Sequence, residues 1–287
     1  MKENDLQDIL CQPCTQLREE LTGIAECGRN SLPASIEIRI AAKIAEMLGY
    51  CMAAVSAAAA AGYQSMAPTG QWFGRTFTGV RNSRQLALTF DDGPNDPHTL
   101  RLLEVLARHE VRATFFVIGR YAQQRGDIVR EVLKAGHVIG NHTLNHPLLT
   151  FRSAAAVRQE LEACRRAITE AAGEHSNLFR PPFGGRRPAV LRVARKLGLE
   201  PVMWDITGFD WNAPSAEYIE QKVVSRVRGG NVILLHDGGH LRIDADRSKT
   251  VVATERLVER FKGNGYDFVT IPEMMEQAAR DQLPATG

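Results

Sequence analysis

The chain has 287 residues, of which 44% are hydrophobic and 24% are charged, a composition typical of globular proteins. Its 35 basic and 33 acidic residues nearly balance, which argues against a nucleic-acid-binding protein, because such proteins carry a strongly basic surface. We interpret basic pairs such as Arg186–Arg187 as solvated surface or local substrate contacts. The length allows one or two domains of about 150 residues, or a single α/β barrel of about 200 to 250 residues.

Residues 1–80 form an N-terminal extension that differs in composition from the remainder. Residues 36–48 have helical patterning, and residues 47–74 contain no charged side chain. An uncharged span of about 20 residues is long enough to cross a bilayer, so we predict a signal anchor at 47–66, with Arg39 and Lys43 on the cytoplasmic side. A cleaved signal peptide and an Ala-rich helix of a soluble protein are the alternatives. We favour export or anchoring, which predicts an extracytoplasmic protein.

Four of the five cysteines precede residue 52, and only Cys164 lies in the body of the chain. Cys11 and Cys14 have the spacing of a metal or redox motif, and Cys27 could add a third thiolate. No second cysteine pair follows at a suitable distance, so we interpret these residues as free thiols.

Regular alternation of strands and helices begins near residue 81 and defines a predicted domain over residues 81–280. Predicted strands cover 85–90, 112–118, 137–140, 177–180, 200–205, 231–236 and 266–270. Predicted helices cover 98–109, 121–135, 153–172, 187–197, 215–227, 250–262 and 271–279. Strands that alternate with helices of about 10 to 15 residues indicate parallel βαβ units. Their number favours a barrel, with an open doubly wound sheet as the alternative that periodicity alone does not exclude.

Two adjacent carboxylates follow the first predicted strand. Asp91 and Asp92 come directly after the apolar run 86–90 and precede Gly93. Adjacent carboxylates repel each other unless a cation or a proton separates them. On opposite sides of the backbone, one of them can bind a metal while the other accepts a proton. A plain Asp-Gly turn is the alternative for this motif taken alone.

Two histidines follow the third predicted strand. His142 and His146 are four residues apart, a spacing that places both imidazoles on one face of a helical turn and allows them to share a metal. Pro147 disfavours helical geometry at His146, so we expect a turn or loop there. Together with Asp92 they make three ligands, which leave coordination positions for water and substrate, as a hydrolytic metal requires.

Two further strand ends carry groups suited to catalysis. Arg180 ends the fourth predicted strand, where its permanent charge can hold a carboxylate, and Pro181–Pro182 fix a loop whose backbone can aim an N–H at an oxyanion. His236 ends the most apolar strand, where we expect a general acid whose pKa is raised by a carboxylate such as Asp210. Taken singly, Arg180 reads equally well as a surface residue and His236 as a structural histidine.

The segments over about residues 84–272 resemble the polysaccharide deacetylases with the NodB homology domain, carbohydrate esterase family 4. Five motifs occur in the order of that family: Thr89-Phe-Asp-Asp-Gly93, His142-Thr-Leu-Asn-His146, Arg180-Pro-Pro-Phe-Gly184, Asp210-Trp211 and Leu234-Leu-His-Asp237. One such motif is weak, but five in order are specific. The resemblance implies a distorted, incomplete (β/α) barrel of about seven strands and a metal-dependent hydrolase that removes acetyl groups, most often N-acetyl groups of hexosamine units, from a polysaccharide.

The resemblance also implies a metal site and its base. Asp92, His142 and His146 would bind one divalent ion, usually Zn²⁺ and sometimes Co²⁺ or another ion. Asp91 would act as the general base that activates water, and Arg180 would orient Asp91.

The remaining implied roles concern the leaving group and the acetyl pocket. Asp210 would tune His236, the general acid. The backbone N–H of Phe183 would help to stabilise the oxyanion; many members of the family have Tyr at this position. Trp211 and Leu234 would form walls of the pocket that receives the acetyl methyl group.

The expected partner is an acetylated polysaccharide or oligosaccharide, with neither nucleic acid nor a protein partner. An O-acetyl esterase acting on a xylan-like polymer, a carbohydrate-binding pseudoenzyme and a metal hydrolase of small amides are the alternatives. The three ligands suit several divalent ions, so the sequence leaves the metal open.

Overall fold

The computed structural model describes residues 34–81, 83–173 and 177–281, and the chain divides into two compact units, Met1–Ala59 and Ala60–Gly287. The predictions for Cys11, Cys14 and Cys27 lie outside the described residues. Helix α2 (Ala34–Met66) joins the helical stretch predicted at 36–48 to the uncharged stretch after it in one continuous helix. By length and composition this helix is able to cross a membrane, and its most apolar stretch is not buried.

The strands of the second unit form one parallel sheet in which β1 is central. The strands are β1 (Gln85–Asp91), β2 (Thr114–Val117), β3 (Val138–Asn141), β4 (Leu178–Phe179), β5 (Glu200–Pro201), β6 (Ile206–Thr207), β7 (Val232–His236) and β8 (Asp267–Phe268). Their order is β5-β4-β3-β2-β1-β7-β6, and β8 pairs with the start of β1. No ladder joins β5 to β6 within the described ranges. This arrangement confirms the predicted distorted, incomplete (β/α) barrel.

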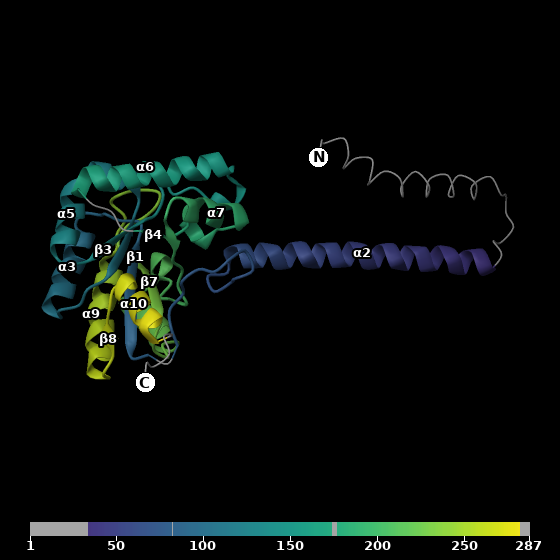
Figure 1. Cartoon of the computed structure of the whole chain (residues 1–287). Coiled ribbons are helices and arrows are strands. Elements are labelled where there is room, and N and C mark those ends of the chain that lie inside the picture. The colour runs from purple at the N-terminus through teal and green to yellow at the C-terminus, as the bar shows by residue number, and fades with distance from the viewer. Residues whose placement is uncertain (1–33, 82, 174–176, 282–287) are drawn as a thin grey trace, which may run out of the picture. The chain divides into compact units, whose positions relative to one another are not determined.

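Helices surround the strands on the outside of the barrel (Figure 1). They are α3 (His98–Arg108), α4 (Gly119–Gln124), α5 (Gly126–Lys134), α6 (Ala154–Ala172), α7 (Pro188–Lys196), α8 (Ala216–Val224), α9 (Ser248–Gly263) and α10 (Ile271–Asp281). Each predicted helix is present, but the one expected over 121–135 is two helices, because the backbone leaves helical geometry at Arg125. Ser153 caps α6 by accepting a hydrogen bond from the Ala156 N–H, and Gly173 ends it in the left-handed conformation that favours glycine.

The strand predicted over 200–205 is wrong. Glu200–Pro201 pairs with β4 at one end of the sheet, and Ile206–Thr207 pairs with β7 at the other end. Between them Val202 and Met203 are fully buried, although neither belongs to a named strand. Val202 makes only an isolated bridge, with Phe77, and its N–H donates to the Phe179 carbonyl at 2.8 Å. Apolar periodicity cannot show that such a run is divided between the two ends of a sheet.

Alternate residues of β1 face opposite sides of the sheet, as in any strand. Leu86, Leu88 and Phe90 pack in the large core between the strands and the outer helices. Ala87 belongs to a different cluster, together with Phe116 of β2, Leu178 of β4 and Val202, which follows β5. Residues 89 and 91 share the side of Ala87, so this alternation directs Asp91 toward the interior of the barrel.

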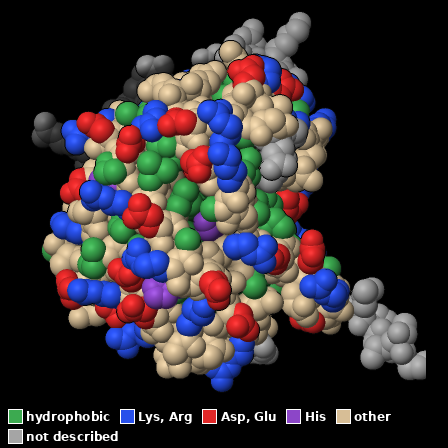
Figure 2. Space-filling model, turned by 90° about the vertical axis from the view of Figure 1, so that its left-hand side faces the viewer, with side chains coloured by type: hydrophobic (Ala, Val, Ile, Leu, Met, Phe, Trp, Pro, Cys, Tyr) green, Lys and Arg blue, Asp and Glu red, His purple; other side chains and the backbone are tan. Residues whose placement is uncertain are grey.

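Charges of both signs are mixed on the molecular face seen in Figure 2, where basic and acidic side chains alternate around small apolar areas. Ion pairs such as Arg108–Glu255, with 2.5 Å between Nη2 and Oε1, join neighbouring helices. This mixing agrees with the near balance of charge in the sequence.

Arg186 is buried, which corrects its interpretation as solvated surface or a substrate contact. Its guanidinium donates hydrogen bonds to the carbonyls of Gly184 (3.0 Å), Ala67 (2.6 Å) and Gly70 (2.6 Å). Its backbone N–H donates to the Ser65 carbonyl at 2.9 Å, and the Ser65 hydroxyl donates back to the Arg186 carbonyl at 2.5 Å. The segment before β1 is thereby fastened to the loop that follows β4.

We expect Arg186→Gln to lower the free energy of unfolding by about 1–3 kcal/mol, because buried carbonyls lose their donors. Chemical denaturation measures this change. The matched control is Arg187→Gln, since Arg187 is only partly buried and bonds a single carbonyl, that of Arg152. Equal stability of the two variants would contradict the role assigned to Arg186.

Candidate functional site

Asp92, His142 and His146 come together at the end of β1 and the loop after β3. The Asp92 Oδ1 atom lies 3.5 Å from His142 Nε2 and 3.2 Å from His146 Nε2. One ligand atom from each residue lies within 4.8 Å of the others, and all three residues are buried. Ligands placed ~2.1 Å from a tetrahedral ion lie roughly 3.4 Å apart, so the spacing fits a metal.

The protonation states of Asp92 and His146 also suit a divalent ion. Burial alone would raise the pKa of Asp92, but contacts with His142 and His240 outweigh burial and hold that pKa well below its usual value. Burial, aided by His142, lowers the pKa of His146 to about 3, so its imidazole is neutral at pH 7. Within the described residues, the buried Oδ1 of Asp92 has no hydrogen-bond partner. An ionised carboxylate and a neutral imidazole present lone pairs, as metal ligands must.

Side chains and backbone of neighbouring residues shape this cluster. The Asp92 and His146 backbones lie in the left-handed region, with φ of 73° and 59°. His146 N–H donates to the Thr143 hydroxyl at 3.0 Å, and Thr143 N–H donates to the Asn141 side chain at 2.9 Å. The two histidines therefore meet across a loop, as Pro147 predicted, and not along a helix. Left-handed backbone conformations are strained for residues other than glycine, and they are concentrated at functional sites.

Asp91 is paired with Arg180 on the inner side of the barrel. The Arg180 Nη1 donates to Asp91 Oδ1 at 2.7 Å and to the Thr89 hydroxyl at 2.8 Å. The carbonyl of Arg180 accepts a hydrogen bond from Nδ1 of His142 at 2.8 Å, which leaves Nε2 of that ring free for a metal. Arg180 is fully buried, and its contact with a carboxylate agrees with the sequence interpretation.

Asp210 and His236 form a second charged pair on the other side of the cleft. Asp210 lies in the short helix η3 (Asp210–Asn212), and His236 ends β7. Asp210 Oδ1 lies 2.8 Å from His236 Nδ1, while Oδ2 accepts from the His236 N–H at 2.7 Å and the Thr250 hydroxyl at 2.9 Å. Burial alone would lower the pKa of His236, but the Asp210 carboxylate raises it to about 9. His236 is therefore a cation at neutral pH.

A cleft of about 570 Å³ is lined by the three candidate metal ligands, by Asp91 and by His236. Its apolar walls include Phe183, Trp211 and Leu234. Phe183 and Trp211 are about half exposed, whereas Leu234 is buried. Phe183 lies in the short helix η2 (Pro182–Gly184) with a φ of 58°.

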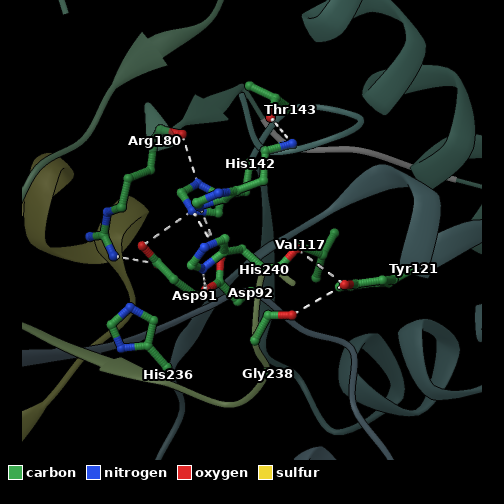
Figure 3. A network of polar contacts seen from close by, with 12 residues as sticks. Asp91, Asp92, Val117, Tyr121, His142, Thr143, Arg180, His236, Gly238 and His240 are labelled. Atoms are coloured by element: carbon green, nitrogen blue, oxygen red, sulfur yellow. Dashed lines mark hydrogen bonds and ion pairs between the residues drawn. The ribbon is translucent and has the colours of Figure 1, made fainter. Parts of the chain in front are cut away.

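The close-up in Figure 3 shows how Asp91, Asp92, His142 and His240 converge, with Arg180 and His236 around them. His240 was missed by the sequence analysis, although it lines the cleft and its ring centroid lies 4.8 Å from that of His146. It follows two glycines in a loop and belongs to no strand end. Its position four residues after His236 was the only signal, and such spacing is weak evidence by itself.

Comparisons with known proteins identify the family. The model of the polysaccharide deacetylase family matches residues 78–202. A peptidoglycan-N-acetylglucosamine deacetylase of Bacillus cereus is 36% identical over 214 residues, which cover 74% of this chain and 96% of that protein. A chitooligosaccharide deacetylase of Rhizobium leguminosarum bv. trifolii is 34% identical over 67% of this chain and 92% of that protein.

A solved structure is similar as well. It is the structure of a pseudoenzyme of carbohydrate esterase family 4 from Bacillus anthracis, which has 27% identity and a TM-score of 0.64 and covers 69% of this chain and 67% of its own. Because the motifs, the barrel and the relatives agree, the chain belongs to the polysaccharide deacetylases of carbohydrate esterase family 4.

Proposed function

We propose that this protein hydrolyses the acetamide group of N-acetylglucosamine units in a polysaccharide, with one divalent metal ion. The observation that carries the proposal is the convergence, in one cleft, of three metal-ligand groups, a carboxylate held by an arginine and a cationic histidine. Hydrolysis of an amide needs an activated water, stabilisation of the oxyanion and a proton for the leaving nitrogen. Each need has a matching group in this cleft.

Asp92, His142 and His146 are the proposed ligands of the ion. Zn²⁺ is the first choice, with Co²⁺ as an alternative, because imidazole and carboxylate donors suit both ions. When bound there, a divalent ion supplies positive charge that acidifies water and polarises the acetyl carbonyl.

Asp91 is the proposed general base. It accepts a proton from water while the water oxygen forms a bond to the acetyl carbon. Arg180 holds Oδ1 of Asp91 through a 2.7 Å hydrogen bond. The other oxygen, Oδ2, lies 3.6 Å from His142 Nε2, close to the proposed ion, and is the atom available for the proton.

His236 is the proposed general acid. Its protonated ring donates a proton to the nitrogen as the bond between carbon and nitrogen breaks, and the products are acetate and a free amine. Asp210 keeps the ring charged until this step. The backbone N–H of Phe183 is proposed to donate to the developing oxyanion, and Trp211 and Leu234 to enclose the acetyl methyl group.

N-acetylated glycans are the proposed substrates, because the two relatives are named for peptidoglycan N-acetylglucosamine and chitooligosaccharides. The apolar helix α2 supports a further proposal, namely that the protein is anchored in a membrane or exported and acts outside the cytoplasm on such a polymer.

Acetate release is the direct test of this function. We expect release from peptidoglycan or chitooligosaccharides that stops on chelation and returns with Zn²⁺ or Co²⁺. Asp91→Asn should lower the rate by about 10²- to 10⁴-fold while the metal stays bound, because only the base is lost. His142→Ala should instead lose the metal, as measured by metal analysis of the purified protein.

The outcomes separate the alternatives. Release of acetate from O-acetylated xylan but not from N-acetylated glycans would show that the activity is that of an O-acetyl esterase and not of an amidase. Metal binding without release from any polymer would indicate a pseudoenzyme, and release from small amides alone would indicate a different hydrolase. Full activity of Asp91→Asn would contradict the assignment of the base.

The charge of His236 has its own test in the metal-free protein. We expect its ring to titrate near pH 9 by NMR, and Asp210→Asn to lower that midpoint, because the carboxylate is what raises the pKa above 6.5. The ion pair therefore stabilises the fold fully below about pH 6.5, and this contribution is lost as pH rises through 9. Thr250→Val, which keeps the Asp210 charge, is the control. A wild-type midpoint at or below 6.5 would refute the assigned ion pair.

Membrane attachment is tested by fractionation of cells that express the full chain. We expect the protein to sediment with membranes after a high-salt wash, and Val55→Lys combined with Ala58→Lys to release it, because each lysine near the centre of a membrane helix costs about 2.5–3.5 kcal/mol. Glu37→Lys, which lies outside the uncharged stretch, is the matched control. A wild-type protein that stays soluble would refute the anchor.

A further inference from the structure

The two carboxylate oxygens of Asp92 face different neighbours. Oδ1 faces the Nε2 atoms of His142 and His146, as the proposed metal requires. Oδ2 lies 3.8 Å from Nδ1 of His240, a residue outside the five motifs. This distance is beyond a direct hydrogen bond but within the range of a charge–dipole contact. His240 thus places a polar ring nitrogen toward Oδ2 of Asp92, the oxygen that does not face the other two proposed ligands (Figure 3).

The His240 ring is also packed against a second ligand. It stacks on His146, with 4.8 Å between ring centroids and 24° between the planes. The Phe183 ring lies nearly perpendicular to both, with its centroid 5.1 Å from that of His240 and 4.5 Å from that of His146. The His240 side chain is 38% exposed, so it forms a boundary between the ligands and the open cleft.

The backbone at His240 is held from outside the loop. The Tyr121 hydroxyl donates to the Gly239 carbonyl at 3.1 Å, and the Arg120 guanidinium donates to the His240 carbonyl. The loop also crosses directly over Asp92: a Cβ at Gly238 would lie 2.1 Å from the Asp92 carbonyl oxygen. Only glycine permits this approach, which brings the following residues over the ligand.

From these contacts we infer that His240 is a positioning residue of the metal site. Its Nδ1 faces Oδ2 of Asp92, so that Oδ1 is turned toward the two imidazoles. The inference rests on the proposed function, because it needs the proposed ion, but it adds a residue to that site. Groups that orient metal ligands commonly change metal affinity when they are removed, by about 10- to 100-fold.

The test measures metal affinity in the purified full chain, by competition between the protein and a chelator for Zn²⁺. We expect His240→Ala to bind Zn²⁺ about 10- to 100-fold more weakly than the wild type. His240→Phe, which retains a ring but no N–H, should be similarly weak. His240→Asn, which retains an N–H donor near the position of Nδ1, should recover affinity close to that of the wild type.

Leu241→Ala is the matched control, because Leu241 is the next residue of the same loop, lines the same cleft and is 84% exposed. Its affinity should equal that of the wild type, and equal melting temperatures of all metal-free variants exclude a general loss of folding. Wild-type affinity in His240→Ala or His240→Phe would overturn the inference, as would an Asn variant as weak as the Ala variant. If the wild type itself binds no ion, the proposed metal chemistry fails instead, so the two failures are distinguishable.

Discussion

Two adjacent carboxylates, Asp91 and Asp92, are the constraint around which the rest of the site is arranged. Both are almost fully buried, at 3% and 4% exposure, where unpaired charge is very costly. Asp91 ends β1, whereas Asp92 follows it with a left-handed backbone, and each carboxylate has its own set of neighbours, although His142 Nε2 lies 3.6 Å from the first and 3.5 Å from the second. Arg180 neutralises the first, and the histidine cluster faces the second. The two carboxylates can therefore have different proposed roles, one as general base and the other as metal ligand, although they are neighbours in sequence.

Arg180 links these two environments through different parts of the same residue. Its guanidinium holds Asp91, and its carbonyl fixes the ring of His142 through Nδ1. The parallel register brings His236 of β7 opposite Asp91 of β1, so the cationic histidine reaches the same end of the sheet. A central strand flanked by β2 and β7 is what allows the proposed base, metal ligands and acid to converge from positions far apart in the sequence.

Apolar strand patterns favoured a barrel, because buried parallel strands have near-continuous apolar runs, and the five motifs implied its incomplete form. Sequence patterns failed where one apolar run is divided between two ends of the sheet, as in the strand predicted over 200–205, and where a charged residue is buried by carbonyl contacts, as at Arg186. The left-handed backbone conformations of Asp92 and His146 could not be predicted from hydrophobic periodicity. His240 was missed for a related reason, because its place depends on a loop crossing that only the folded chain creates.

Membership of the fold family is not sufficient for activity, since a pseudoenzyme of the same family shares this architecture. What matters is the set of charge states in the cleft. Burial drives each of these groups toward its neutral form and keeps His146 neutral at pH 7, yet Asp92 is ionised and His236 is protonated. Neighbouring residues outweigh burial at Asp92 and His236, and opposed protonation states within one cleft are what acid–base chemistry needs. Asp210 and Arg180 therefore matter to the proposed chemistry through the charges they stabilise, at His236 and at Asp91.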